Sequence, residues 1–133
     1  MIRTFLDSGV LIAASRMPGP SDERVLRLLD DPGRIFLTSP FVYLEVAPKS
    51  IFYKRHLECK FYDRFFENAQ WYRDLGKIEA AGRTEAIKLG LAAMDALHLA
   101  AAHLSNAGEF ITTEKPAKPI HRSSLVKVRY LFG

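Results

Sequence analysis

Four acidic side chains stand out because each lies beside or within an apolar segment, where an unpaired charge is costly. Asp7 and Glu114 each follow a short run rich in β-prone residues, whereas Glu45 and Asp95 lie in apolar segments with helical spacing. Each acid alone could be a helix cap or a solvated residue. As a group, carboxylates repel one another and raise each other's pKa unless a cation neutralises them. Oxygen ligands of this kind favour Mg²⁺ or Mn²⁺.

The segments that position these acids alternate between strand-like and helix-like patterns. We predict strands at 2–6, 34–38, near 71–75, at 109–113 and, as an edge strand, at 125–131. We predict helices at 9–15, after a cap at Ser21, from Pro40, at 50–69, at 78–89 and at 92–104, with Pro48 kinking or ending the helix that starts at Pro40. This alternation predicts one α/β domain over 1–133, a three-layer α/β/α sandwich with a mainly parallel central sheet.

The predicted order of elements brings the acids to one edge of the sheet. In open parallel α/β sheets, functional groups gather beyond the carboxyl ends of the strands. Asp7 and Glu114 come directly after the first and fourth predicted strands, and Glu45 lies in the helix that follows the second. Asp95 opens the last long helix, at the flank of its apolar stripe. We therefore expect the four carboxylates to face a common site.

The residues around the four acids resemble the four sequence blocks of the PIN-domain family. These blocks are "FLDSGVLIAA", the acid in "FVYLEVA", "MDALHLAAA" and "FITTEK", in order along nearly the whole chain. At this size the chain is similar to the VapC-like toxins of bacterial toxin–antitoxin pairs. The resemblance implies a PIN-like fold, a metal-dependent endoribonuclease using Mg²⁺ or Mn²⁺, an RNA substrate, a cognate antitoxin as partner and a homodimer.

The same resemblance implies a role for each acid. Asp7 and Asp95 would be direct metal ligands, Glu45 would bind the ion or orient water, and Glu114 would help to hold a second ion. The family more often has aspartate at the position of Glu114, so the number of ions stays open. His98, one turn after Asp95, is expected to orient a neighbour or pack rather than to bind metal.

Polar and basic residues near the fourth acid are candidate substrate contacts. The hydroxyl groups of Thr112 and Thr113 could bind a water or a phosphate, or could simply end a strand. Lys115 and Arg122 are the basic candidates. No acid follows Glu114, whereas five Lys or Arg residues do, which leaves the first 114 residues with a net charge of −1.

A second basic segment is interleaved with aromatic residues, a composition that suits a phosphate backbone with unstacked bases. Its alternative interpretation is a solvated helix face. The segment contains Lys49, Phe52, Tyr53, Lys54, Arg55, Lys60, Phe61, Tyr62 and Arg64.

Composition limits the other classes. At 133 residues and 48% apolar content, the chain can fill one domain. No apolar stretch approaches the roughly 20 residues of a membrane span, and the N-terminus lacks a signal-like pattern, so we expect a cytoplasmic protein with no membrane partner. The single cysteine, Cys59, excludes an internal disulfide.

Two other functions stay open from the residues alone. One is a catalytically weak or inactive PIN-like module that binds RNA or protein without cutting. The other is a phosphoryl-transfer hydrolase or receiver domain that uses Asp7 as nucleophile or acceptor. The second has less support, because Gly9 replaces the second acid of an Asp-x-Asp pattern and no glycine-rich phosphate cradle follows the strands.

Overall fold

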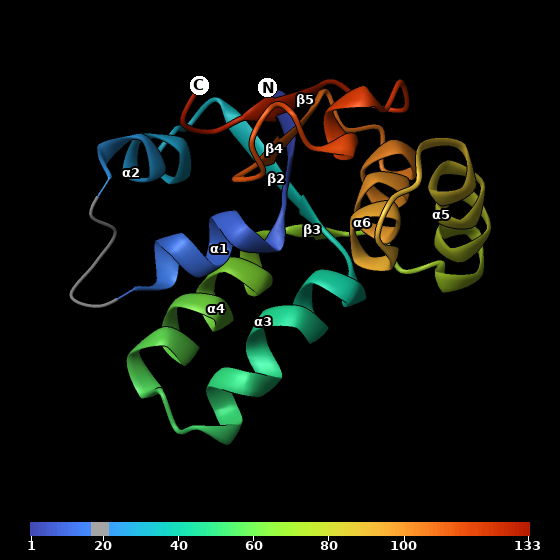
Figure 1. Ribbon diagram of the computed structural model, residues 1–133. Coiled ribbons are helices and arrows are strands. Elements are labelled where there is room, and N and C mark those ends of the chain that lie inside the picture. Colours follow the sequence, from blue (N-terminus) through green and yellow to red (C-terminus); the bar gives the residue numbers. More distant parts are fainter. Residues whose placement is uncertain (17–21) are drawn as a thin grey trace.

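The computed structural model describes residues 1–16 and 22–133, and within them five strands form one sheet (Figure 1). The strand order is β3-β2-β1-β4-β5, and every neighbouring pair is parallel. The strands are β1 (Ile2–Leu6), β2 (Arg34–Thr38), β3 (Gln70–Trp71), β4 (Glu109–Thr112) and β5 (Val128–Tyr130). The predicted parallel sheet and its edge strand near the C-terminus are confirmed.

Helices cover both faces of this sheet, which gives the predicted three layers. On one face α6 packs against the strands with α5 alongside it, and α1, α2 and α4 lie on the other side (Figure 1). α3 packs against α1, α4 and α6. The helices are α1 (Ser8–Ser15), α2 (Glu23–Leu29), α3 (Pro40–Phe52), α4 (His56–Asn68), α5 (Leu75–Leu89) and α6 (Ala93–Leu104), with a 3₁₀ turn η1 (Pro119–Arg122).

The core lies between the central strands and the helices on either side. Phe5 of β1 and Phe110 of β4 are fully buried and stack with ring centroids 5.6 Å apart. Leu11 of α1 and Leu99 of α6 are also fully buried, one on each side of the sheet. Burial of such side chains contributes about 1.5–3 kcal/mol each, so β1 and β4, which carry the site, are among the most firmly held strands.

The predicted long helix over 50–69 is wrong, because two helices replace it. α3 passes through Pro48, which was predicted to kink or end it, and continues to Phe52. The carbonyl that loses its donor at this proline belongs to Leu44, an exposed residue, so solvent can satisfy it. Lys54 then adopts a left-handed conformation with φ 54°, and α4 starts at His56.

Side chains at helix starts position the elements after the strands. Ser39 caps α3 by accepting a hydrogen bond from the backbone N–H of Phe41 at 3.3 Å, directly before the predicted helix start at Pro40. Asp22 caps α2, and the predicted cap Ser21 lies outside the described residues. In the part of the chain that the structure describes, no helix combines the length and apolar character needed to cross a membrane.

Candidate metal and nuclease site

Asp7 is the most firmly positioned of the four acids. It follows β1 directly and is 5% exposed. Its Oδ1 accepts a hydrogen bond from the backbone N–H of Ser8 at 2.9 Å, which makes Asp7 the cap of α1. Its Oδ2 accepts a hydrogen bond from the hydroxyl group of Thr112, the last residue of β4, at 2.7 Å. Two neighbouring strand ends therefore fix this carboxylate.

The hydroxyl group of Thr112 also connects Asp7 to Glu114. While it donates to Asp7, it accepts a hydrogen bond from the backbone N–H of Glu114 at 3.0 Å. Thr112 is fully buried, so its side chain positions both acids. Contact between this hydroxyl group and substrate stays a prediction.

Gly9 is a site residue that sequence reasoning missed. It lies in the first turn of α1, where a Cβ atom would come 2.4 Å from the side-chain oxygen of Thr113. Real Cβ atoms essentially never approach so closely. The glycine therefore lets α1 start directly against the end of β4, and the motif Asp-Ser-Gly was the available signal.

Glu45 and His98 form a second fixed pair, between α3 and α6. The Nε2 atom of His98 lies in hydrogen-bonding contact with Oε1 of Glu45. The hydrogen bond from His98 is the main cause that lowers the pKa of Glu45 below its ordinary value. The His98 ring is 1% exposed, and its Nδ1 has no hydrogen-bond partner among the described residues. The predicted orienting or packing role of His98 agrees with this contact.

Asp95, in the first turn of α6, shows that the four acids share one region of space. Burial raises its pKa, and the charges of Asp7 and Glu114 raise it further. The charge of His98 offsets part of this effect, and Glu45 adds a smaller increase. Acids from three other segments thus act on this one carboxyl group, as expected for residues that gather at the carboxyl edge of the sheet.

The donor chemistry at this edge fits a hard divalent cation, because four carboxylates are available and a cation would relieve their repulsion. In the conformation shown, no three His, Cys, Asp or Glu side chains among the described residues are arranged to hold one ion. The structure gives no hydrogen bond, within 1–16 and 22–133, to the carboxylate oxygens of Asp95 or Glu114. Among the four acids, hydrogen bonds to the side chain therefore hold Asp7 and Glu45.

The basic candidates lie on the segment that follows Glu114. The Nε2–H of His121, in η1, donates to the backbone carbonyl oxygen of Glu114 at 2.7 Å and ties this segment back to the site. Lys115 and Arg122 are exposed. Thr113 is half-buried next to Gly9. Substrate contacts by Thr113, Lys115 and Arg122 stay predictions.

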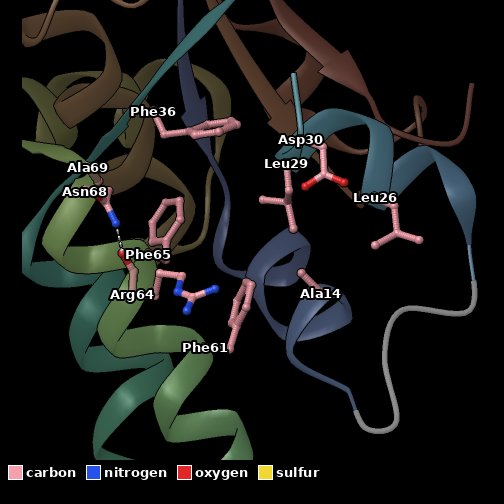
Figure 2. A pocket seen from close by; sticks show the side chains of 10 residues that line it. All are labelled: Ala14, Leu26, Leu29, Asp30, Phe36, Phe61, Arg64, Phe65, Asn68 and Ala69. Atoms are coloured by element: carbon pink, nitrogen blue, oxygen red, sulfur yellow. Dashed lines mark hydrogen bonds between the residues drawn. The ribbon is translucent and has the colours of Figure 1, made fainter. Parts of the chain in front are cut away.

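A groove lies elsewhere, between α2 and α4 and over the end of α1 (Figure 2). Phe61 and Phe65 of α4 face Leu26 and Leu29 of α2 across it, and Arg64 points into it (Figure 2). None of the four acids lines this groove. Its mainly apolar lining suits packing contacts, and the chemistry that the acids predict belongs to the sheet edge.

Comparison with known proteins supports the fold. No protein-family model matches the sequence, and no curated protein is similar enough to count as a match. Three solved structures are similar over nearly the whole chain. A chain of VapBC2 from Rickettsia felis, bound to a DNA fragment from their promoter, has a TM-score of 0.73 at 18% identity and covers 97% of this chain and 98% of its own.

This chain has the fold of such VapBC chains. A chain of a toxin–antitoxin complex from Klebsiella pneumoniae has a TM-score of 0.70 at 18% identity, with coverage of 92% and 94%. A chain of DNA-bound VapBC from Salmonella typhimurium has a TM-score of 0.69 at 14% identity, with coverage of 98% and 99%. The PIN-like, VapC-like architecture that the four sequence blocks predict is thus confirmed at the level of the fold.

Proposed function

We propose that this protein is a metal-dependent endoribonuclease and the toxin of a toxin–antitoxin pair. The observation that carries the proposal is that the charges of Asp7, Glu114 and Glu45 all raise the pKa of Asp95, in a fold shared with VapBC chains. Stable isolated folds avoid uncompensated carboxylates, so this cluster has its best explanation in a bound cation.

The four acidic residues would have different roles at this site. Asp7, held by Ser8 and Thr112, and Asp95 would be direct metal ligands, and Glu114 would help to hold a second ion. Glu45, kept ionised by His98, binds the ion or orients the attacking water. A bound Mg²⁺ or Mn²⁺ would supply a water of lowered pKa and stabilise charge on the scissile phosphate. This water would then hydrolyse one P–O bond of the RNA backbone, and the products would be two RNA fragments.

The test is cleavage of a labelled RNA by the purified protein with Mn²⁺ or Mg²⁺, against chelator. Asp7→Asn keeps the shape of the side chain and can still accept the hydrogen bond from Ser8, but it removes the charge. We expect cleavage that requires the metal and falls by roughly a hundredfold or more in the variant, since even supporting contacts at metal sites are worth 10- to 100-fold. Full activity in Asp7→Asn would exclude this ligand assignment.

The expected partners follow from the proposed toxin role. The similar structures are described as VapBC or toxin–antitoxin complexes, which supports an antitoxin as the partner of this protein. Expression of the protein in the cytoplasm should arrest growth, and a neighbouring short reading frame should relieve the arrest. A homodimer is part of the same proposal, and sedimentation equilibrium measures it.

One observation favours the second candidate, a PIN-like module that binds RNA or protein without cutting. Glu45 is already engaged by His98, and no three of the acidic, histidine or cysteine side chains among the described residues converge on one ion in this conformation. Calorimetric titration with Mn²⁺ separates the two candidates. A protein that binds RNA equally well with and without metal, and never cuts it, is the inactive module.

A further inference from the structure

The connection between α3 and α4 gathers exposed aromatic and basic side chains at the end of the molecule furthest from β5 (Figure 1). We call Phe52, Tyr53, Lys54 and Arg55 the α3–α4 tip. The side chains of Phe52 and Tyr53 are 76% and 57% exposed. Their rings meet edge to face with centroids 5.0 Å apart, and the guanidinium group of Arg55 lies 5.3 Å from the centroid of Tyr53. The two aromatic rings of the tip therefore contact each other and Arg55 but remain exposed to solvent.

The structure divides the basic and aromatic segment that the sequence singles out. Tyr62 is buried and donates a hydrogen bond to the side-chain oxygen of Ser15 at 2.9 Å, so it belongs to the core. Phe52 and Tyr53 have no such packing. A solvated helix face explains exposed lysine and arginine, but it does not explain exposed phenylalanine beside them.

Lys54 adds a backbone observation. Its φ of 54° lies in the left-handed region, where glycine is the usual residue at a helix C-terminus. Keeping a side chain there costs of the order of 1 kcal/mol. Despite this cost, a positively charged residue occupies this position of the chain, after the two aromatic residues and before α4.

The tip is continuous with the acidic site. Glu45, Lys49 and Tyr53 follow one another at intervals of four residues, which places them on one face of α3. Eight residues of helix span about 12 Å. A pocket between α1, α3 and α4 runs along this face, and its lining includes Glu45, Lys49, Arg55 and, from the end of α1, Arg16.

From this arrangement we propose that the α3–α4 tip is a binding platform for single-stranded RNA. The proposal rests on the proposed ribonuclease function. Bases of the strand stack on Phe52 and Tyr53, its phosphates contact Lys49, Lys54 and Arg55, and the strand continues along α3 to the acids. Sequence-tolerant stacking combined with backbone cations is the usual mode of single-strand recognition.

Charge favours RNA over a second copy of this chain at the tip. Lys49, Lys54, Arg55 and Lys60 lie in the same segment of the chain as the two aromatic residues, and the acid of this segment, Glu58, is paired with Arg55 at 3.8 Å. Two such tips facing each other would bring like charges together. A polyanion would instead neutralise them.

The test is fluorescence anisotropy with a labelled ten-nucleotide single-stranded RNA, in chelator so that nothing is cut. Phe52→Ala should weaken binding by roughly five- to a hundredfold, the range for losing one stacked base. Ile87→Ala, which truncates a side chain that is 79% exposed on α5, should leave binding unchanged. Equal affinity for Phe52→Ala and wild type would overturn the proposal.

Lys54→Gly separates binding from folding. Glycine relieves the left-handed φ, so the melting temperature should hold or rise, while RNA affinity falls several-fold and the salt dependence loses about one phosphate contact, a slope change of about 0.7. Asn106→Gly is the matched control, because Asn106 has φ 58° and carries no charge. An equal effect on RNA binding in both glycine variants would contradict the charge argument.

Sedimentation mass and RNA cleavage distinguish failure of the proposed RNA platform from failure of the proposed nuclease function. If Phe52→Ala changes the sedimentation mass and leaves RNA affinity intact, the tip is a surface for self-association and the proposal is wrong. If wild-type protein binds RNA through the tip but never cuts it with Mn²⁺, the nuclease function fails and the platform stands. If wild type cuts RNA and the tip variants keep its affinity and KM, the platform alone fails.

Discussion

A threonine hydroxyl group donates a hydrogen bond to a carboxylate near each end of strands β1 and β4, but the two carboxylates have different surroundings. At the amino end, Thr4 of β1 donates to Oε2 of Glu109, the first residue of β4, at 2.9 Å. At the carboxyl end, Thr112 of β4 donates to Asp7 after β1 at 2.7 Å. In each case a buried threonine on one strand holds an acid on its neighbour.

The two ends differ in what balances the acid. Glu109 is paired with Arg34, which it contacts directly, and with Arg129 at 3.2 Å. Arg34 also donates to the hydroxyl group of Thr4 at 2.8 Å, so the amino-end network is complete. At the carboxyl end, His98 is the imidazole that contacts one of the four acidic side chains among the described residues. A complete network is typical of a structural role, whereas uncompensated charge on a rigid frame indicates a ligand.

The largest effect on stability should come from breaking the complete network. Glu109→Gln takes one of two carboxylate partners from Arg34, whose side chain is 13% exposed, and leaves it with Asp31 at 3.0 Å. Losing one partner of a buried pair costs about 3–5 kcal/mol, and we expect the lower end of this range because Asp31 still pairs with Arg34. Urea unfolding measures this loss, and RNA cleavage per folded molecule should stay at the wild-type level. A nearly unchanged free energy of unfolding would show that solvent already screens this pair.

A smaller effect should come from the close approach of α1 to β4. Gly9→Ala places a Cβ atom against the side-chain oxygen of Thr113, and overpacking of this kind costs about 1–3 kcal/mol. Gly76→Ala is the matched control, since Gly76 is also the second residue of a helix and a Cβ atom there meets Asp74 at an ordinary 3.7 Å. The control should be stabilising by about 0.5–1 kcal/mol, because alanine favours helix.

A double variant sharpens the prediction for Gly9. In Gly9→Ala with Thr113→Ala the clashing oxygen is gone, and the remaining Cβ atom of residue 113 lies at an acceptable 3.6 Å. Thermal unfolding should therefore recover most of the lost stability. If the double variant is as unstable as Gly9→Ala, the clash is not the cause.

The acids could be predicted from the sequence because strand ends are local features. Short β-prone runs place Asp7 and Glu114 at one edge once the sheet is parallel, and that needs no knowledge of side-chain contacts. The contact between Glu45 and His98 could not be found in this way, since 53 residues separate them and only tertiary packing joins α3 to α6. The space that Gly9 leaves for Thr113 is a contact of the same non-local kind.

The largest error in the predicted fold has a different physical origin. Pro48 is the strongest helix breaker in its region, yet the helix continues through it, and Leu44, whose carbonyl loses its donor, is an exposed residue. The actual break depends on the left-handed backbone of Lys54, which closes α3 with a hydrogen bond from the N–H of Arg55 to the carbonyl oxygen of Ser50 at 2.9 Å. Lysine gives no signal for this conformation, as glycine would.

The smallest predicted effect on stability is an increase, because the substitution removes a negative charge from the carboxyl end of the strands, where the acids are not balanced. Asp95→Asn should stabilise the metal-free protein at neutral pH. Burial and the charges of Asp7 and Glu114 raise the pKa of Asp95 above its ordinary value of 3.8. A group with a raised pKa contributes stability below its unfolded value and loses it as the pH rises through the folded value. Ionised Asp95 therefore opposes folding at neutral pH, and asparagine does not.

Urea unfolding in chelator, for wild type and Asp95→Asn between pH 7 and pH 4, measures this difference. The advantage of the variant should be largest at pH 7 and should shrink as the pH falls through the raised pKa of folded Asp95 towards the ordinary value of 3.8. Asp63→Asn, at an exposed position on α4, should show no such trend. A stabilisation by Asp95→Asn that is the same at every pH would mean that the gain comes from packing, and the carboxyl end would then be as well compensated as the amino end.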